Sequence, residues 1–462
     1  MSELIYASAA AIAKAIRTKG VSSREMAEAC VQRIEQVNPK LNAVVQMNAE
    51  SALLQAQQAD DELAHGHVRG PLHGVPMTIK DNLDTADMVT TGGTKGRMGF
   101  VPEQDATVVS RLREAGAILL GKTNTPELTL AFETDNLIYG RTNNPYDLSR
   151  TSGGSSGGAA AIIAAGGIPF DIGSDTGGSI RLPSHFCGIA GIRPTSGRVP
   201  RTGHILPPGG PSDALTQIGP MARYVEDLIM ILPIIAGVDW HDPAIVPMNV
   251  GDPADVDFEG LRIAFHTDNG IVTPIPEIRE SVEAAAKALD HAGLSVLEAR
   301  PSGIEQAPEL FFGLMQGDGG AGIQKLLRMY GTDEPHPWIQ DLIEQAKESQ
   351  MTSARFGELL FQLDLFRSQM LLFMEAYDVI VCPVNAYPAM PHGTCAEHLP
   401  SFSYTFTYNL TGWPGVVVRV GTIGEGLPIG VQIVARPWRE DVALKIAQFL
   451  EKEFGGWIRP PT

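Results

Sequence analysis

Short apolar runs that indicate strands alternate with helical stretches along almost the whole chain. The helical stretches carry apolar residues at helical spacing, whereas the strand-like runs are short and almost continuously apolar. Strands that are buried on both faces have such continuous runs, because helices cover both sides of the sheet. The alternation therefore predicts an α/β fold with a large mixed β-sheet core that helices cover on both faces.

The predicted elements are spread from the start of the chain to its end. Strands are expected at 43–47, 75–79, 117–120, 168–170, 261–265, 295–297, 379–382, 416–420 and 431–434. Helices are expected twice before residue 39 and again at 50–63, 105–114, 159–165, 278–291, 356–377 and 442–454.

Capping residues and prolines predict several helix ends. Ser22 opens a capping-box sequence that starts the second helix, and Pro39 is expected just past its end. Asp105 can cap a helix that runs to Glu114. The sequence Thr125-Pro126-Glu127 is expected to open another helix, since proline is favoured at the first helical position.

Length and charge narrow the class of protein. No repeat or long linker interrupts the 462 residues, so we expect a single domain, 1–462, with insertions. A net charge of −18 argues against a nucleic-acid partner, because phosphate binding needs clustered lysine and arginine.

The N-terminus lacks a signal-peptide pattern, and the apolar run 228–238 is too short to cross a bilayer. We therefore expect a cytoplasmic monomer or homodimer without a membrane partner, whose four cysteines are free thiols.

Two clusters of glycine and serine stand out from the apolar background. The first is Gly153-Gly154-Ser155-Ser156-Gly157-Gly158, and the second is Asp175-Thr176-Gly177-Gly178-Ser179-Ile180-Arg181. A flexible linker has a similar composition, but linkers do not lie between apolar runs such as 159–165 and 168–170. Because glycine has no Cβ, the clusters predict a site where the backbone comes close to a reacting group.

Together with a third segment, these clusters resemble the amidase signature family of serine amidohydrolases. The third segment is Gly74-Val75-Pro76-Met77-Thr78-Ile79-Lys80-Asp81, and the three segments occur in the expected order. The resemblance covers about residues 72–223, with a weaker similarity at 426–432. It implies a hydrolase with an amidase-signature-type fold.

The resemblance also implies a catalytic triad of Lys80, Ser155 and Ser179. Neutral Lys80 would accept a proton from Ser155, which in turn would accept one from Ser179, the nucleophile that forms the acyl-enzyme. Burial would favour the neutral amine, because it disfavours the charged form. The peptide bond between Gly154 and Ser155 would be cis. No cofactor and no metal are implied.

A tight glycine turn beside the nucleophile is expected to bind the oxyanion through successive backbone N–H groups. In proteins that this chain resembles, residues matching Ser156, Asp175 and Arg181 support the triad by hydrogen bonding. A plain salt bridge is the alternative role for Arg181. The expected oxyanion donors are the N–H groups of Thr176, Gly177, Gly178 and Ser179.

Apolar and aromatic segments at 128–132, 311–312 and 402–408 predict the substrate pocket, with core packing as the alternative for each. A glycine-rich stretch at about 313–323 is expected to be a mobile loop, and a substrate lid is as consistent with it as a surface loop without function. The residues expected to line the pocket are Thr129, Leu130, Phe132, Phe402 and Tyr404.

The leading interpretation is a stand-alone amidase that acts on small, largely apolar amides. Aryl and acyl amides, carbamates and some esters are the candidate substrates. The alternative within the family is the glutamine-hydrolysing A subunit of a tRNA-dependent amidotransferase, which needs a protein partner and a polar pocket. A catalytically silent binding protein is disfavoured, because all three triad positions are intact.

Two further motifs match known patterns but fail on their context. The stretch 116–123 has the letters of a phosphate-binding loop, yet such a loop follows a strand and precedes a helix, which is the reverse of the order here. Lys122 within it is therefore expected to be structural. The stretch 154–158 matches a nucleophile elbow centred on Ser156, which would indicate a histidine-dependent hydrolase. No downstream histidine carries a motif of its own.

Overall fold

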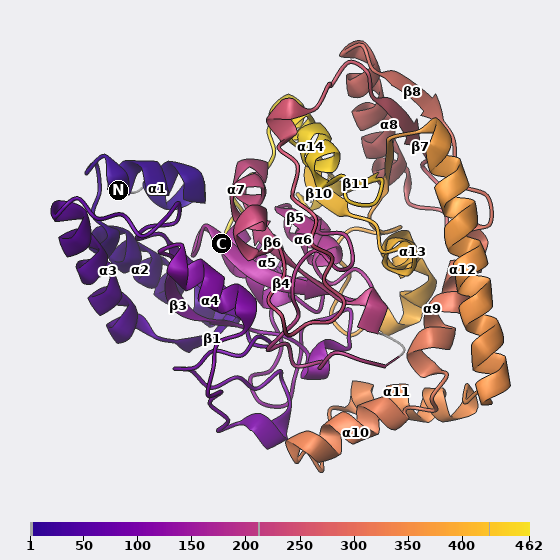
Figure 1. The fold of residues 1–462 in the computed structure, drawn as a ribbon, viewed down its shortest axis with the longest axis horizontal. Helices are drawn as coiled ribbons and strands as arrows, with labels where there is room; N and C mark the ends of the chain where they lie inside the picture. The colour runs from indigo at the N-terminus through magenta and orange to yellow at the C-terminus, as the bar shows by residue number, and fades with distance from the viewer. Residues whose placement is uncertain (1–2, 211–212, 425) are drawn as a thin grey trace.

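Eleven strands form one mixed sheet in the computed structural model, which describes residues 3–210, 213–424 and 426–462 (Figure 1). The strands are β1 (Val44–Met47), β2 (Pro76–Lys80), β3 (Ile118–Thr123), β4 (Phe170–Asp175), β5 (Ala190–Arg193), β6 (Gln217–Ala222), β7 (Arg262–Phe265), β8 (Ser295–Glu298), β9 (Val379–Pro383), β10 (Gly415–Thr422) and β11 (Pro428–Ala435). Their order across the sheet is β1-β3-β2-β4-β6-β5-β10-β11-β9-β7-β8. Parallel pairs join β2 to β3 and β4, and β7 to β8 and β9. The other pairs are antiparallel.

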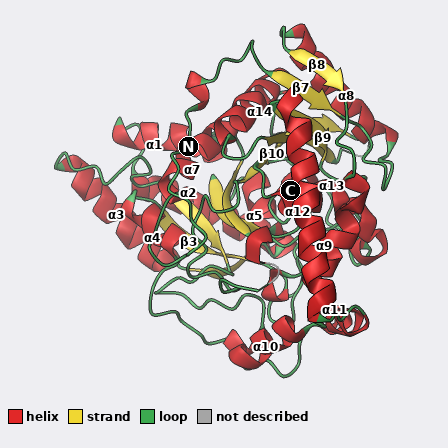
Figure 2. Cartoon of the chain, turned by 45° about the vertical axis from the view of Figure 1, so that its right-hand side comes forward, coloured by secondary structure: helices red, strands yellow, loops and turns green. Residues whose placement is uncertain are grey.

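Helices pack on both sides of this sheet, as Figure 2 shows. The predicted fold, a large mixed sheet covered by helices on both faces, is therefore confirmed. The α-helices of the described residues are α1 (Ala9–Arg17), α2 (Ser23–Leu41), α3 (Ala49–Ala64), α4 (Thr107–Glu114), α5 (Gly157–Ala164), α6 (Arg181–Cys187), α7 (Val225–Ile235), α8 (Pro276–His291), α9 (Ala307–Gln316), α10 (Ala321–Tyr330), α11 (Pro337–Glu348), α12 (Ser353–Ala376), α13 (Ser403–Thr411) and α14 (Glu440–Phe454).

Three predicted helix ends need correction. Pro39 lies inside α2, which continues to Leu41 because a proline in the last turn removes only one backbone donor. Asp105 does not cap α4, since its carboxylate instead accepts a hydrogen bond from the backbone of Ala86. The segment after Pro126 forms a single 3-10 turn, because the two residues Leu128 and Thr129 have φ values of +52° and +60° that end the helix.

The glycine-rich stretch is shorter and more ordered than the predicted loop at 313–323. Residues up to Gln316 belong to α9 and residues from Ala321 belong to α10, so only four residues connect the helices. Both oxygens of the Asp318 carboxylate accept backbone N–H groups, from Gly320 and Gly322 at 2.8 Å each. The stretch is therefore a hydrogen-bonded turn between two helices. That it acts as a lid stays a prediction.

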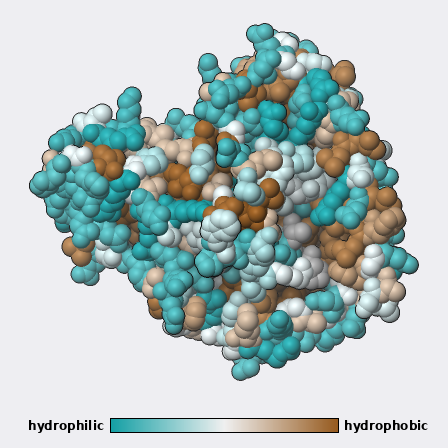
Figure 3. All heavy atoms as spheres, viewed as in Figure 1, coloured by the Kyte–Doolittle hydropathy of each residue, from teal (hydrophilic) through white to brown (hydrophobic). Residues whose placement is uncertain are grey.

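Helices α9 to α12 form the outer layer on one side of the molecule (Figure 1). The longest of them, α12, buries one face and exposes large apolar side chains on the other, and apolar surface is visible on this side in Figure 3. The exposed side chains are Leu360, Phe361, Leu365, Leu371 and Leu372. No helix in the described part of the chain combines the length and apolarity that crossing a bilayer requires.

The centre of the sheet carries the two glycine-serine clusters. Every residue from 151 to 195 is buried, and this stretch contains β4, which lies between β2 and β6. All four cysteines are buried and free. Polar groups in this region must therefore find hydrogen-bond partners within the protein.

Candidate active site

Lys80 is the last residue of β2, and its amine lies in a cage of hydroxyl groups. The side chain is fully buried. Its Nζ atom is 2.7 Å from the Oγ of Ser155, 3.0 Å from that of Ser156 and 3.2 Å from that of Ser174. Among the described residues, no carboxylate forms an ion pair with this amine. The structure therefore brings Lys80 together with the first of the two serine clusters.

Burial lowers the pKa of Lys80 to about 7. The cause is desolvation, which disfavours the charged ammonium, and the negative charges of Asp171 and Asp175 only partly oppose it. A lysine with this pKa is neutral in a large fraction of molecules near neutral pH. A neutral amine can accept a proton from a hydroxyl group.

Ser155 and Ser156 lie in the turn that leads into α5. The peptide bond between Gly154 and Ser155 is cis, as the family resemblance implied. Tight packing around the turn explains its glycines: a Cβ added to Gly158 would lie 2.4 Å from the backbone nitrogen of Asn124. The glycines thus let the turn approach the neighbouring backbone closely enough for both hydroxyls to reach Lys80.

Gly173 in β4 also shapes this cage, and sequence reasoning missed it. A Cβ at this position would lie 2.8 Å from Ser156 Oγ, which is itself a neighbour of Lys80 Nζ. A side chain at 173 would therefore push the hydroxyl away from the amine. An isolated glycine inside a strand pattern is the signal that could have revealed it.

Ser179 lies in the turn between β4 and α6, beside a cavity. Gly178 in this turn has a φ of +123°, and an added Cβ would lie 2.3 Å from Oγ1 of Thr405, so only glycine fits. The Ser179 carbonyl accepts a hydrogen bond from the Ser156 N–H at 3.2 Å, which joins the two serine clusters. The Ser179 hydroxyl has no hydrogen-bond partner among the described residues. It is therefore available to a molecule in the cavity.

A buried ion pair holds this turn in shape. Arg181 donates to the Asp175 carboxylate through Nε and Nη2, each at 3.0 Å, and both side chains are fully buried. The same carboxylate accepts the N–H groups of Gly178 at 2.9 Å and Ile180 at 3.1 Å. Burial raises the pKa of Asp175, but the charges of Arg181 and Arg193 and the hydrogen bonds from Arg181 and Asn409 together outweigh burial and hold the pKa below its usual range. The carboxylate therefore stays ionised.

Residues far along the chain complete this cluster. Arg181 Nη1 donates to Gln432 Oε1 at 2.7 Å, and Asn409 Nδ2 donates to Asp175 Oδ1 at 2.8 Å. Asn409 belongs to α13 and Gln432 to β11, so the ion pair links three distant segments. Sequence reasoning missed Asn409, because no local motif singles it out, and assigned no role to Gln432, although Gln432 ends the segment 426–432 that weakly resembles the family.

The four N–H groups predicted to bind an oxyanion differ in their availability. The Gly178 N–H already donates to Asp175. Within the described residues, the N–H groups of Thr176, Gly177 and Ser179 have no acceptor. The geometry therefore disfavours Gly178 as an oxyanion donor and leaves the other three N–H groups available.

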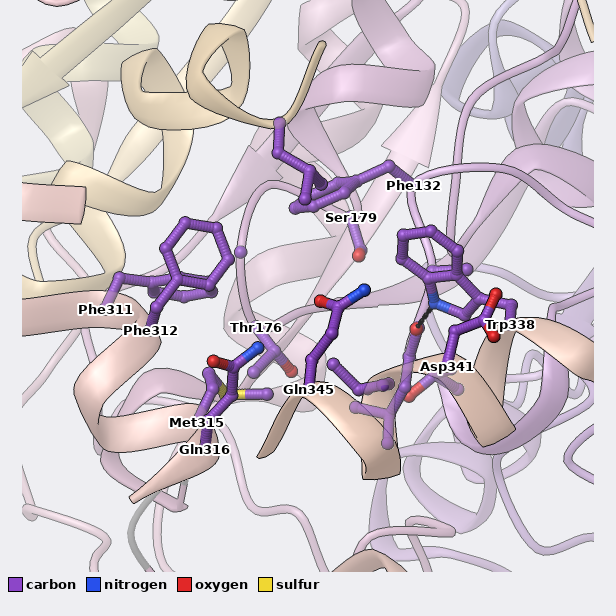
Figure 4. A pocket seen from close by; sticks show the side chains of 16 residues that line it. Phe132, Thr176, Ser179, Phe311, Phe312, Met315, Gln316, Trp338, Asp341 and Gln345 are labelled. Atoms are coloured by element: carbon purple, nitrogen blue, oxygen red, sulfur yellow. Dashed lines mark hydrogen bonds between the residues drawn. The ribbon is translucent and has the colours of Figure 1, made fainter. Parts of the chain in front are cut away.

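An open cavity lies over Ser179 (Figure 4). Its walls are mostly apolar, with amide and carboxylate groups of Gln316, Asp341 and Gln345 among them. The indole Nε1 of Trp338 donates to the backbone carbonyl of Leu130, which joins α11 to the opposite wall. The lining residues are Thr129, Leu130, Ala131, Phe132, Thr176, Gly177, Ser179, Phe311, Phe312, Met315, Gln316, Trp338, Asp341, Leu342, Gln345 and Leu399.

Three of the five residues predicted to line the pocket do so, namely Thr129, Leu130 and Phe132. Phe402 instead lies behind the wall, where its ring stacks on Phe132 with the ring centres 3.9 Å apart. The prediction for Tyr404 is wrong, because this residue is buried and its hydroxyl donates to the backbone of Val272. The contribution of α11 was missed, since its amphipathic pattern is typical of any surface helix.

The two misleading motifs have structural roles. Lys122 lies in β3, fully buried, and donates to the Leu83 carbonyl at 2.6 Å and to the hydroxyls of Thr85 and Thr90. Its segment follows α4 and is a strand, which excludes a phosphate-binding loop. Ser156, the centre of the elbow-like motif, contacts Lys80, and none of its hydrogen bonds with described residues involves a histidine.

Comparisons with known proteins extend the similarity over nearly the whole chain. Residues 25–444 match the Amidase family. The chain is 33% identical to the A subunit of the glutamyl-tRNA(Gln) amidotransferase of Heliobacterium modesticaldum, over 96% of each protein. It is 34% identical to an acylamidase of Rhodococcus erythropolis, over 97% of this chain and 95% of that protein. The solved structure of 6-aminohexanoate cyclic dimer hydrolase complexed with substrate superposes with a TM-score of 0.88, at 27% identity and 99% coverage of both chains.

Proposed function

The chain belongs to the amidase signature family, and from this membership we propose that it is a stand-alone amidase with Ser179 as its nucleophile. The observation that carries the proposal is the contact of Lys80 Nζ with Ser155 Oγ, at 2.7 Å, beside the turn that presents Ser179 to an apolar cavity. A serine hydroxyl is a weak nucleophile until a base accepts its proton. The neutral form of Lys80 is that base.

Acylation would begin when Ser179 Oγ attacks the carbonyl carbon of the amide. The Ser179 proton passes to Ser155, whose own proton passes to Lys80, so that one positive charge appears on the ammonium. The carbonyl oxygen becomes an oxyanion, which the available N–H groups of Thr176, Gly177 and Ser179 bind. Loss of such a donor typically costs about 3 to 4 kcal/mol in the barrier.

The relay then runs in reverse. Lys80 returns its proton through Ser155 to the amide nitrogen, the carbon–nitrogen bond breaks and the amine leaves. A water molecule attacks the remaining ester of Ser179, with Lys80 again accepting a proton through Ser155. The acid leaves, and Ser179 recovers its hydroxyl proton. The group that acts as base in one half-reaction acts as acid in the other.

The cavity walls support small apolar amides as substrates. Phe132, Phe311, Phe312 and Met315 present apolar surface above Ser179, which suits an aryl or acyl group. The triad and the oxyanion donors contact only the carbonyl and the leaving nitrogen. A carbamate has the same two groups, so we include carbamates, and some esters, among the proposed substrates.

A glutamine-hydrolysing component of an amidotransferase is the second candidate. It is favoured by the 33% identity to the Heliobacterium modesticaldum protein and by the polar side chains of Gln316, Asp341 and Gln345 in the cavity. Such a component would depend on a protein partner and would have little use for aromatic walls. A stand-alone amidase for apolar substrates explains more of the residues that line the cavity, because most of its walls are apolar.

The test is a panel of anilides, primary amides, carbamates and glutamine, combined with covalent labelling by a fluorophosphonate. We expect hydrolysis of anilides without any partner protein, and labelling at Ser179 that the Ser179→Ala variant abolishes. The Ser156→Ala variant is the matched control, because it removes a neighbouring hydroxyl but retains the nucleophile. Labelling at Ser156, or activity on glutamine alone, would overturn the proposal.

A further inference from the structure

Building on the proposed role of Lys80 as base, we propose that Asp171 is a positioning residue for the reaction. Its buried carboxylate acts through space on the Lys80 amine and sets the pH above which that amine can accept a proton. Asp171 belongs to none of the three sequence motifs and touches neither the cavity nor the three hydroxyls around Lys80.

Asp171 and Lys80 lie on the same face of two adjacent parallel strands. In the register of β2 and β4, Thr78 is paired with Asp171, and Thr78 Oγ1 donates to Asp171 Oδ2 at 2.6 Å. Side chains two residues apart in a strand point to the same face, so Lys80 shares that face with Thr78. Lys80 lies two residues along β2 from the position opposite Asp171. The rise of two residues and the spacing between adjacent strands together give about 8 Å between the Cα atoms of Asp171 and Lys80.

Neither group has a contact partner of opposite charge. The Asp171 side chain is fully buried, and its Oδ2 accepts hydrogen bonds from the hydroxyls of Thr78 and Thr123. Its Oδ1 has no hydrogen-bond partner, and no lysine or arginine of the described residues pairs with it. Lys80 likewise has only hydroxyl neighbours. Each is therefore the nearest uncompensated charge of opposite sign available to the other.

The other two buried carboxylates near Lys80 are compensated by cations. Asp175 pairs with Arg181 at 3.0 Å. Asp81 lies 4.0 Å from Lys122 Nζ and accepts a hydrogen bond from the Thr91 hydroxyl. Their charges are balanced locally, so Asp171 supplies the negative charge that Lys80 experiences without an intervening cation.

The remaining ionisable groups around Lys80 do not replace Asp171. Burial lowers the pKa of His204 to about 3, so this histidine is neutral, and its Nε2 faces the side-chain amide of Asn82 at 2.8 Å. Arg193 lies 3.8 Å from Asp175 and adds to the compensation there. Lys122 compensates Asp81 and also lowers the pKa of Asp171, but less than Lys80 does.

Burial shifts the pKa of the Asp171 carboxyl and that of the Lys80 amine towards each other. Burial raises the pKa of Asp171 to about 7, and burial lowers the pKa of Lys80 to about 7. Two negative charges oppose the lowering of the Lys80 pKa, and that of Asp171 has the larger effect. Two groups that interact in this way release their protons as a coupled pair. The charge of Asp171 and the protonation of Lys80 are therefore linked.

The test compares Asp171→Asn with Thr123→Val. The first removes the charge and keeps the shape, whereas the second removes one of the two hydrogen bonds that lower the pKa of the Asp171 carboxyl. The readout is the rate of fluorophosphonate labelling of Ser179 between pH 5 and 10. We expect the acid limb of the wild-type profile to move down by about one to two pH units in Asp171→Asn, because loss of a nearby negative charge disfavours the ammonium. We expect Thr123→Val to move the limb in the same direction by less, because loss of this hydrogen bond raises the pKa of Asp171 and leaves its carboxylate ionised in fewer molecules.

A purely structural role for Asp171 would slow labelling at every pH in both variants and leave the limb unmoved, which would overturn the inference. Asp171→Ser provides the same measurement if the asparagine variant does not fold, as judged by circular dichroism. Lys80→Ala separates the two proposals. An acid limb that persists without Lys80 contradicts the proposed function itself, whereas a limb that needs Lys80 but ignores Asp171 contradicts only the role of Asp171.

Discussion

The two walls of the cavity are built in different ways. The reaction wall, Thr176, Gly177 and Ser179, lies at the end of a central strand where every residue from 151 to 195 is buried. The helical wall, formed by α9 and α11, comes from the outer layer of the molecule. Helix α11 buries only Ile339, Ile343 and Ala346 along one side.

This difference separates chemistry from substrate selection. The pKa of a buried lysine and the stability of a buried ion pair depend strongly on the surrounding charges, because electrostatic interactions are strong where water is excluded. Apolar helix faces discriminate weakly, by about 1 to 3 kcal/mol per methylene. We therefore expect the reaction wall to tolerate almost no substitution and the helical wall to change specificity without loss of the fold.

Replacement of the two buried lysines, Lys80 and Lys122, is the most severe test of whether the chemistry depends on the residues behind the reaction wall. We expect Lys80→Met to lower kcat/KM by ~10³-fold or more at every pH, because the base is lost. Wild-type activity should rise with pH through about 7, since burial lowers the pKa of Lys80 to about 7 and the neutral amine predominates above that value. Lys122→Met, the matched control, should destabilise the fold but keep the activity at high pH that Lys80→Met loses, because Lys122 does not contact the reacting groups. Steady-state kinetics from pH 5 to 10 measure both variants. Near-normal rates in Lys80→Met would refute the assignment of Lys80 as the base.

Breaking the ion pair behind the reaction wall should have the next largest effect. We expect Arg181→Met to lower the free energy of unfolding by about 3 to 5 kcal/mol, because it leaves the Asp175 carboxylate buried without its partner. Arg355→Met removes two exposed ion pairs, with Glu309 of α9 and Glu358 of α12, and should cost at most about 1 kcal/mol. Urea denaturation measures both variants. Equal losses of unfolding free energy would show that a buried ion pair contributes no more to stability here than exposed ones do.

The helical wall should affect substrates unequally. We expect Phe311→Ala to lower kcat/KM by roughly 10- to 100-fold for a bulky anilide and hardly at all for acetamide, because only the larger substrate reaches the aromatic wall. Phe361→Ala on the exposed face of α12 is the control and should change neither. A Phe311→Ala enzyme that loses both activities in parallel would place this residue in the chemistry instead.

The smallest effect is expected at the turn between α9 and α10. Gly320 has a φ of +77°, so Gly320→Ala should cost about 1 to 2 kcal/mol of stability. Gly357→Ala, inside α12 with open space around it, should instead gain up to about 1 kcal/mol. Thermal unfolding measures both. A change in kcat/KM for the anilide alone in Gly320→Ala would support the lid hypothesis, and unchanged kinetics would count against it.

Local sequence patterns predicted most of the fold correctly. Strands such as β2 and β9 follow from short apolar runs, and the capping box at Ser22 and Glu25 starts α2 as predicted. The errors have two causes: a tertiary contact that overrides a local preference, and a local hydrogen-bonded turn that composition did not reveal. Asp105 bonds to a distant backbone group instead of capping its own helix, and the stretch near Gly319 is a hydrogen-bonded turn where composition alone indicated a long loop.

The sequence by itself determined which residues can carry the chemistry, because the motif that contains Lys80 and the two glycine-serine clusters are local features of the chain. Only the tertiary structure decided what surrounds them. Strand order places Asp171 beside Thr78, and it brings Gln432 to Arg181 across 251 positions of sequence. Side-chain packing decided that Phe402 supports Phe132 from behind and that Trp338 joins the cavity wall. Periodicity along a chain shows which face of an element is apolar, but its partner across space depends on how all the elements pack together.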